Sequence, residues 1–306
     1  MKEDNKIIVA NMAKIAVVIL IILAFAVLGR ALPPPLPYVF TPETSKQANL
    51  EVKGNLDVDL FTGAAVYSYP IDTPPGTNGL RPQVNLFYNS QTAVGGPGLL
   101  GSGWRLSESY IQRDTNYSFA NASDDSYGLV LEGATYDLIF SLTDKRYHTK
   151  IESYLFIENK SGGGDNDYDQ FWFVKRQDGT TYRFGNYNFS ELASNLHNYA
   201  SRWYLDFVND TYNNSIFYNY TEDPFPEDNG TAYLMNITYN NDKKRNVGFV
   251  YESNNQPGIR AVYEEGNNVK ISRRLKQIEL NANGLLVKRY IFDYTTFEDP
   301  KSVSFI

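Results

Sequence analysis

The chain has 306 residues, of which 28 are basic and 35 acidic, so its formal net charge is −7 with histidine neutral. The basic residues are scattered along an acidic chain except at Lys243-Lys244-Arg245 and Arg273-Arg274, and they give no sign of the one-sided basic surface that a nucleic-acid backbone requires, so we expect no nucleic-acid partner. The absence of cysteine rules out disulfides, a thiol nucleophile and a Cys2His2 zinc site. With 24 Tyr and 18 Phe, the chain is rich in residues that favour the half-buried surface of a sheet, which predicts an all-β fold of many short antiparallel strands.

An apolar segment near the N-terminus predicts export. Residues 15–28 are uncharged and apolar, and the small residues Gly29 and Ala31 follow where a signal peptidase would cut. The run is short for spanning the roughly 30 Å of membrane hydrocarbon, but it becomes long enough for a transmembrane anchor if residues 7–13 join it. We expect residues 1–31 to form one hydrophobic helix that acts as a signal peptide or a signal anchor, and both alternatives are open. Either one places the remainder outside the cytoplasm, secreted or at the cell surface.

The rest of the chain divides by composition. Five prolines lie between residues 33 and 42, so residues 32–47 are predicted to form a stiff, extended spacer. After it, short alternating segments separated by Gly, Pro, Asn and Asp predict one β domain at residues 48–296. Residues 297–306 would be a tail or a point of truncation.

The predicted strands follow one another along the domain. Aromatic and β-branched residues alternate in them with polar ones, as in strands with one buried face. The clearest are residues 65–69, 84–88, 128–131, 136–140, 154–157, 171–174, 233–239, 247–252 and 275–294. The best helix candidate is the short segment 189–196, with Ser190 as its N-cap, although a long loop fits it equally well.

Three turns are predicted from residues that tolerate a positive φ. Asp178-Gly179 and Asn283-Gly284 stand between alternating segments and are strong signals of tight hairpins. Asn213 follows the segment Trp203-Tyr204-Leu205. Asn is the next-best residue after Gly at positive φ, so we expect a turn there as well.

The order of these motifs resembles the N-terminal region of SpvB-type proteins. That family includes the B component of insecticidal toxin complexes and neighbours the Rhs/YD-repeat proteins. The N-terminal motifs that carry the resemblance are Gly63, Tyr67 and Pro70; Pro74-Pro75-Gly76; Pro82, Leu86, Tyr88 and Ser90; and Gly101, Gly103 and Trp104. Further motifs follow at Asp178-Gly179 with Gly185, at Trp203 and at Asn283-Gly284. At Asn213 the chain departs from the family's usual Gly.

The resemblance implies a structural role. In the resembled toxin-complex and Rhs proteins, aromatic-rich strands wind into a hollow shell that encloses a toxic polypeptide. The implied role here is the opening segment of such a shell, with a downstream YD-repeat shell or toxin polypeptide as partner and no cofactor. SpvB proteins also carry an ADP-ribosyltransferase domain marked by Glu-x-Glu, which is absent here, so that activity is not expected. The alternative is a cell-surface adhesin or carbohydrate-binding β module, in which exposed Tyr and Trp stack on sugars.

Few residues are candidates for a catalytic role, and we expect no enzymatic activity. The carboxylate pairs Asp57/Asp59 and Glu264/Glu265 are the only glycosidase-like candidates, and both are expected on the surface. The two histidines, His148 and His197, are also expected in surface segments, without the Gly-x-Ser-x-Gly elbow of a hydrolase. The alternation of Asp165, Asp167 and Asp169 predicts at most weak calcium binding, because Gln170 and Arg176 occupy the positions of the turn glycine and the bidentate glutamate.

Asn-x-Ser/Thr triplets would allow N-glycosylation in a host with the machinery, although several arise by chance in a chain rich in Asn, Ser and Thr. They begin at Asn116, Asn121, Asn159, Asn188, Asn209, Asn213, Asn219, Asn229 and Asn236.

Overall fold

In the computed structural model the chain divides into two units, Met1–Val52 and Lys53–Ile306. The structure describes residues 54–60, 62–95, 97–118, 123–256, 261–264, 267–294 and 304–305, all of which belong to the second unit. The predicted hydrophobic helix and the Pro-rich spacer lie outside these residues. Within the described ranges, no helix has the length and apolar character needed to cross a membrane.

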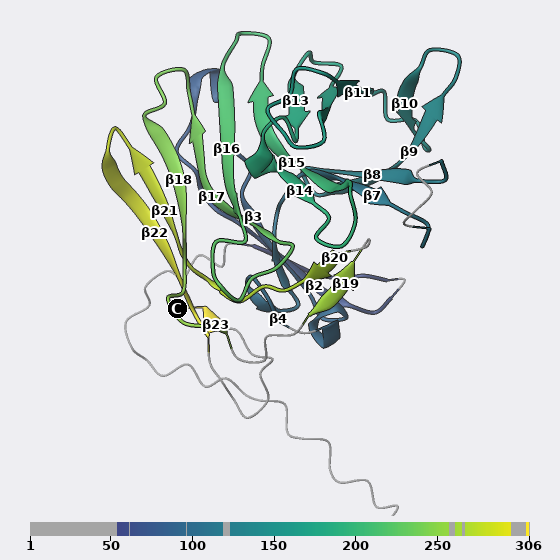
Figure 1. Ribbon diagram of the computed structural model, residues 1–306. Coiled ribbons are helices and arrows are strands. Elements are labelled where there is room, and N and C mark those ends of the chain that lie inside the picture. Colours follow the sequence, from purple (N-terminus) through teal and green to yellow (C-terminus); the bar gives the residue numbers. More distant parts are fainter. Residues whose placement is uncertain are drawn as a thin grey trace, which may run out of the picture. The chain divides into compact units, whose positions relative to one another are not determined.

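Eight antiparallel strands of the second unit form a closed barrel (Figure 1). They are β7 (Tyr110–Asp114), β8 (Ser126–Leu131), β9 (Ala134–Ser141), β10 (Arg146–Thr149), β11 (Phe156–Ser161), β12 (Gln170–Lys175), β13 (Thr181–Phe184) and β15 (Ala200–Asn209). Each pairs with the next in this order, and β15 closes the ring by pairing with both β13 and β7. The closure removes the free edges that an open sheet of these strands would expose.

A second, open sheet branches from β15. The first half of β15 pairs with β7, with Trp203 opposite Ile111, whereas its second half pairs with β16, with Phe207 opposite Phe217. The open sheet continues through β16 (Ser215–Glu222), β17 (Ala232–Tyr239), β18 (Arg245–Tyr251), β21 (Leu275–Ala282), β22 (Leu285–Asp293) and β23 (Ser304–Phe305). The short β14 (Glu191–Ala193) pairs with β15 beyond β13. β15 is therefore shared by the barrel and the open sheet.

A small sheet from the N-terminal part of the domain contacts the open sheet. It consists of β1 (Asn55–Val58), β2 (Ala65–Pro70), β3 (Asn85–Asn89) and β6 (Trp104–Leu106). The Tyr239 hydroxyl on β17 donates a hydrogen bond to the Pro74 carbonyl at 2.6 Å, and the Tyr69 and Tyr290 rings meet edge to face at 6.2 Å. The remaining elements are the hairpins β4 (Pro97–Gly98) with β5 (Gly101–Ser102) and β19 (Val262–Glu264) with β20 (Asn267–Val269), and the 3-10 turns η1 (Thr77–Gly79), η2 (Thr92–Gly95) and η3 (Asn188–Ser190).

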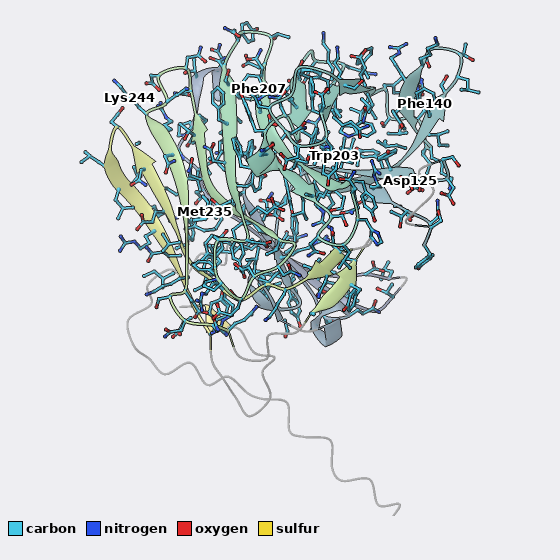
Figure 2. The ribbon with its side chains drawn as sticks, in the orientation of Figure 1. Asp125, Phe140, Trp203, Phe207, Met235 and Lys244 are labelled. Carbon is cyan, nitrogen blue, oxygen red and sulfur yellow. The ribbon has the colours of Figure 1, made fainter. Side chains whose placement is uncertain are left out.

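Aromatic side chains from four barrel strands meet in the core. Trp172 and Trp203 are fully buried, with ring centroids 5.8 Å apart, and Tyr127 and Tyr147 lie 5.0 and 4.8 Å from Trp172. Large rings bury much apolar surface, and their tilted and edge-to-face contacts add to that burial. Trp203 is labelled at the centre of Figure 2.

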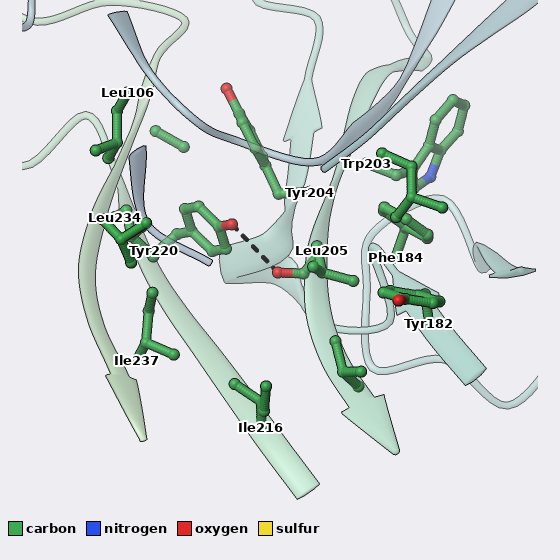
Figure 3. Packing of buried hydrophobic residues seen from close by; sticks show 14 of the residues in the cluster. Leu106, Tyr182, Phe184, Trp203, Tyr204, Leu205, Ile216, Tyr220, Leu234 and Ile237 are labelled. Atoms are coloured by element: carbon green, nitrogen blue, oxygen red, sulfur yellow. Dashed lines mark hydrogen bonds between the residues drawn. The ribbon is translucent and has the colours of Figure 1, made fainter. Parts of the chain in front are cut away.

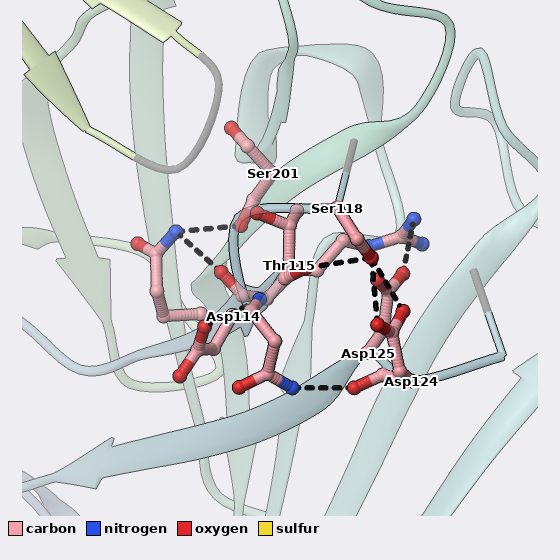
Figure 4. A network of polar contacts seen from close by, with 9 residues as sticks. Asp114, Thr115, Ser118, Asp124, Asp125 and Ser201 are labelled. Carbon is pink, nitrogen blue, oxygen red and sulfur yellow. Dashed lines mark hydrogen bonds and ion pairs between the residues drawn. The ribbon is translucent and has the colours of Figure 1, made fainter. Parts of the chain in front are cut away.

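One ion pair is buried beside this cluster. Arg113 on β7 lies 3.2 Å from the carboxylate of Asp125, and both side chains are more than nine-tenths buried. Figure 4 labels Asp125 in its network of polar contacts. The guanidinium also stacks over Tyr199 and Trp203, at 4.9 and 5.7 Å from the ring centroids. Burial raises the pKa of Asp125, and Arg113 opposes that rise.

The apolar core continues from the barrel under the open sheet. Figure 3 shows Ile216, Leu234 and Ile237 of the open sheet beside Leu205 of β15, and all four are buried. Here the Tyr220 hydroxyl donates a hydrogen bond to the Leu205 carbonyl at 3.2 Å. A buried tyrosine thereby adds its ring to the core without leaving its polar end unpaired.

The fold confirms the predicted all-β class and the predicted turns. Gly179 and Gly284 have φ of 87° and 77°, at the ends of the hairpins β12–β13 and β21–β22, and Asn213 takes a φ of 62° between β15 and β16. The helix candidate at residues 189–196 is not a helix. The chain forms only η3 there and then enters β14, because pairing with the buried strand β15 satisfies its backbone.

Candidate functional site

The N-terminal motif residues build a compact aromatic corner. Trp104 on β6 meets Tyr67 of β2 at 6.0 Å and Tyr88 of β3 at 5.2 Å between ring centroids. Gly103 precedes this tryptophan with a φ of 78°, and a Cβ there would lie 2.8 Å from the Tyr88 ring and 2.9 Å from the Asn89 carbonyl. Glycine at this position therefore lets two strands approach, which is a structural role.

The other members of the first motif group lie in the turns around the small sheet. Gly63 precedes β2, and Pro70 is its last residue. Pro75 and Gly76 lie in the turn before η1, and Gly101 belongs to β5. Pro82 lies before β3, and its carbonyl oxygen accepts a hydrogen bond from the Thr73 hydroxyl. A Cβ on Gly76 would lie 1.7 Å from the Leu80 carbonyl oxygen.

Two of the later motif residues, Gly185 and Trp203, form the corner between β13 and β15. Gly185 has a φ of 70°, and a Cβ there would lie 2.1 Å from Cδ1 of Trp203. Next to it, the buried carboxylate of Asp206 accepts hydrogen bonds from Arg183 and from the Asn186 backbone, each at 2.7 Å. Burial raises the pKa of Asp206, and these partners oppose the rise.

The candidate catalytic residues are not brought together. Asp57 and Asp59 are exposed in and just after β1 and accept hydrogen bonds from nearby backbone N–H groups, those of Val58 and Thr62. Glu264 is half-exposed and pairs with Arg202 at 3.0 Å, while Glu265 lies outside the described residues.

The two histidines lie on the surface, in separate segments. His148 belongs to β10, where its Nε2 lies 2.9 Å from Asp144, and His197 stacks on Tyr199.

The calcium candidates stand in the segment between β11 and β12. Asp165 is held by backbone hydrogen bonds with Asn186 and Asn188, and the Asp169 carbonyl accepts one from Gly162. Across the described part of the chain, no group of three or more His, Cys, Asp or Glu side chains is placed to hold a metal ion. Asp167 acts instead on the buried Glu191 of β14, whose pKa is raised to about 7, first by burial and then by this charge.

Two adjoining hollows were not predicted from the sequence. A polar groove of about 390 Å³ lies between the residues that precede β3, including Arg81 and Gln83, and barrel residues such as Arg176 and Tyr182. An inner cavity of about 50 Å³ shares part of this lining and reaches Glu108. No sequence signal marks Glu108, because Ser107-Glu108-Ser109 has the polarity of an ordinary surface connection.

The outer edge of the open sheet is a candidate interaction surface. Among the described residues, β22 pairs with β21 along one side, whereas on its other side only Phe292 and Asp293 pair with β23. Four apolar side chains on β22 are largely exposed: Leu285 (73%), Leu286 (48%), Val287 (59%) and Ile291 (55%). An apolar edge strand with free backbone groups is a ready template for a further strand.

The first comparison concerns protein families. Residues 60–139 match the family model described as the Salmonella virulence plasmid 65 kDa B protein, SpvB. The match covers the N-terminal motifs and the first barrel strands, and it confirms the predicted resemblance to SpvB-type proteins. A comparison with curated protein sequences finds no significant match.

Solved structures share the fold over most of this chain. The N-terminal domain of the effector SpvB from Salmonella typhimurium has a TM-score of 0.59 at 16% identity, over 74% of this chain and 93% of that one. The TcdB2-TccC3 crystal structure has a TM-score of 0.62 at 19% identity, and the Tc holotoxin pore of Photorhabdus luminescens one of 0.64 at 16% identity. These two matches cover 79% and 82% of this chain but 15% of the other chain in each case. At such identities the likeness concerns the fold: the chain contains an SpvB-like β module, related in fold to Tc toxin components.

Proposed function

We propose that this chain is an exported, non-catalytic structural module that forms the opening wall of a β shell enclosing a toxic polypeptide. The observation that carries the proposal is the outer part of the open sheet, where β22 exposes apolar side chains and, among the described residues, is paired by β23 only at Phe292 and Asp293. A β shell can grow when a further strand pairs with such an edge. The main-chain groups of the edge strand form hydrogen bonds with the incoming strand, and its alternate side chains make specific contacts with it. The fold shared with TcdB2-TccC3, whose chain is far longer, supports the same assignment.

The distribution of polar groups supports a role without catalysis. The aspartates of β1 are bound to their own backbone, Glu264 is bound to Arg202, and the histidines lie in separate surface segments. A catalytic site requires a nucleophile or a pair of proton-transfer groups held around one reacting atom. We therefore assign the buried polar residues to the architecture of the wall.

The native size of the protein tests the shell assignment. An antibody raised against the folded module is used to isolate the product from its source cells, and its mass is measured under native conditions. We expect an assembly much larger than the 34.8 kDa of this chain, containing YD-repeat sequence in the same polypeptide or in a bound one. A native product of 34.8 kDa or less, without a bound polypeptide, contradicts the assignment.

Substitution of the edge tests whether β22 makes the contact. Leu285→Lys with Val287→Lys places two charges on the proposed contact and should abolish the larger assembly. Leu142→Lys is the control. Leu142 is an apolar residue between β9 and β10 that is 85% exposed and lies far from this edge, so the introduced lysine should leave the assembly intact. Equal effects of the two changes would exclude β22 as the site of strand addition.

Export itself rests on the sequence of residues 1–31. N-terminal sequencing of the native protein distinguishes the two expected forms, since cleavage after Ala31 removes the hydrophobic segment and a signal anchor keeps it. Recovery of the intact protein only from the cytoplasm contradicts both.

A second candidate function is carbohydrate binding, and the polar groove favours it. Arg81 is exposed at the groove with no ion-pair partner among the described residues, and Gln83, Asn85 and Thr180 add polar groups to the lining. A small number of polar groups in a concave site is typical of ligand binding. Binding on a glycan array that is lost in Arg81→Ala supports this function, and the absence of any binding dismisses it.

A further inference from the structure

The segment that leads into β3 presents a row of hydrogen-bond donors to the polar groove. Pro82 and Val84 are buried, whereas Arg81 and Gln83 are exposed, and this alternation is that of an extended chain. Arg81, Gln83 and Asn85 therefore share one side of the segment, and all three line the groove. At roughly 3.3 Å per residue the row is about 13 Å long, so it is longer than a single sugar ring.

Arg81 is the charge that the groove leaves unpaired. The charged side chains of the lining are those of Asp72, Arg81, Glu132 and Arg176. Arg176 pairs with Glu132 at 2.7 Å, and Asp72 pairs with Lys288 of β22 at 3.4 Å. No carboxylate of the described residues pairs with Arg81, although the chain as a whole has a net charge of −7. The groove therefore presents one exposed, uncompensated guanidinium to an anion.

The two amides beside Arg81 are also free to bind a ligand. The Asn85 backbone N–H donates a hydrogen bond to the Ser107 hydroxyl at 2.8 Å, and this hydroxyl donates to the Gln83 carbonyl at 3.2 Å. These bonds engage the main chain of the row, and within the described ranges no residue hydrogen-bonds to the side-chain amides of Gln83 and Asn85. A held backbone with free polar side chains is preorganised for binding, which lowers the entropy lost when a ligand docks.

The described lining of the groove offers no exposed aromatic ring for stacking. Its aromatic residue is Tyr182, which is only 3% exposed and whose hydroxyl donates a hydrogen bond to Glu132 at 3.1 Å. A sugar in this groove would lack the apolar ring surface that an exposed aromatic side chain provides. Its binding must therefore come from charge and hydrogen bonds.

We propose that the groove binds glycans that carry a carboxylate, such as uronic or sialic acids, with Arg81 as the partner of the carboxylate and Gln83 and Asn85 as donors to neighbouring hydroxyls. This assignment rests on the second candidate function, carbohydrate binding, and specifies its ligand class. The planar guanidinium of arginine donates two parallel hydrogen bonds to a carboxylate, an arrangement that a neutral sugar does not offer. Because such charge-assisted bonds are strong, loss of the carboxylate or of Arg81 should weaken binding at least about tenfold.

A glycan array that pairs each uronic-acid or sialic-acid glycan with its carboxyl-reduced form tests the ligand class with the full chain. The members of a pair differ only in a carboxylate or a hydroxymethyl group. We expect at least one acidic member to bind about tenfold or more tightly than its reduced form, and added salt to weaken that binding. Equal binding within every pair, or binding confined to sulfated glycans, overturns the carboxylate assignment and leaves carbohydrate binding in place. No binding to any glycan dismisses both.

Substitution of single arginines locates the contact. Arg81→Gln should abolish the preference for the acidic member. Arg105→Gln removes the same charge from an exposed arginine of β6, which stacks over Phe87 at 5.7 Å outside the groove, and should preserve the preference. Equal losses in the two variants would mean general attraction of charge and would overturn the assignment. If Arg81→Gln does not fold, Arg81→Lys decides, because lysine keeps the charge without the paired donors, and an undiminished preference would then exclude the proposed contact.

Discussion

Replacing Gly185 by alanine tests whether the corner between β13 and β15 depends on close backbone approach. The new Cβ would lie 2.1 Å from Cδ1 and 2.7 Å from Cβ of Trp203, which is fully buried. Trp203 cannot move away without cost, because its Nε1 donates a hydrogen bond to the Gln170 carbonyl at 3.0 Å and its ring packs in the barrel.

The expected loss has two parts. An alanine at a φ of 70° costs about 1–2 kcal/mol, and overfilling a packed core costs a further ~1–3 kcal/mol. The sum is about 2–5 kcal/mol, which is a large part of the roughly 5–15 kcal/mol that stabilises a typical domain. Because 1 kcal/mol lowers the Tm of a domain of this size by about 2–4 °C, a shift of at least ~4 °C is expected.

Gly63 provides the matched control. Its φ is 71°, and no atom lies within 4 Å of the position its Cβ would take, so Gly63→Ala carries the backbone cost alone. The free energy of unfolding of both variants is measured in urea, with tryptophan fluorescence as the signal. Their Tm is measured by circular dichroism. If the two variants lose the same stability, Trp203 is not the obstacle and the reasoning from close approach fails.

Three further substitutions address buried polar groups. Arg113→Met leaves the buried Asp125 without its partner and should lower the free energy of unfolding in urea by about 3–5 kcal/mol. If the further change Asp125→Leu restores none of the lost stability, the broken ion pair is not the cause of the loss. Tyr239→Phe removes the hydrogen bond to the Pro74 carbonyl, and a loss of about 0.5–1.5 kcal/mol is expected; no change in Tm would mean that the bond contributes nothing. Glu191 keeps its proton more strongly when folded, since its pKa is raised from 4.5 to about 7, so its contribution to stability should fall by about 3 kcal/mol as pH rises from 4.5 to 7 and then level off. Glu191→Gln should reduce the slope of stability between pH 4.5 and 8 without flattening it, because the pKa of Glu108 is also raised to about 7; an unchanged slope would show that Glu191 does not contribute.

Local features of this protein follow from its sequence. Alternating residues define the strands, and Asn283-Gly284 predicts the hairpin β21–β22 because both residues accept positive φ, as observed at 53° and 77°. The motif around Trp104 likewise predicts the corner of the small sheet, since Gly103 permits a conformation that other residues avoid. These properties depend on residues that are neighbours in the chain, so a single sequence contains them.

The site itself depends on contacts between distant segments. Pairing of Gln112 with Arg202 closes the barrel across 90 residues, and the alternation within either strand does not specify its partner. Oε1 of Glu108 is buried without a hydrogen-bond partner only because groups from β15, β16 and β18 pack around a link that has the composition of a surface loop. The sequence by itself determined the strands, the turns and the resemblance to SpvB-type proteins. The tertiary structure alone decided where the barrel closes, which edge stays open and which charges are buried, because desolvation and strand pairing are properties of the assembled chain.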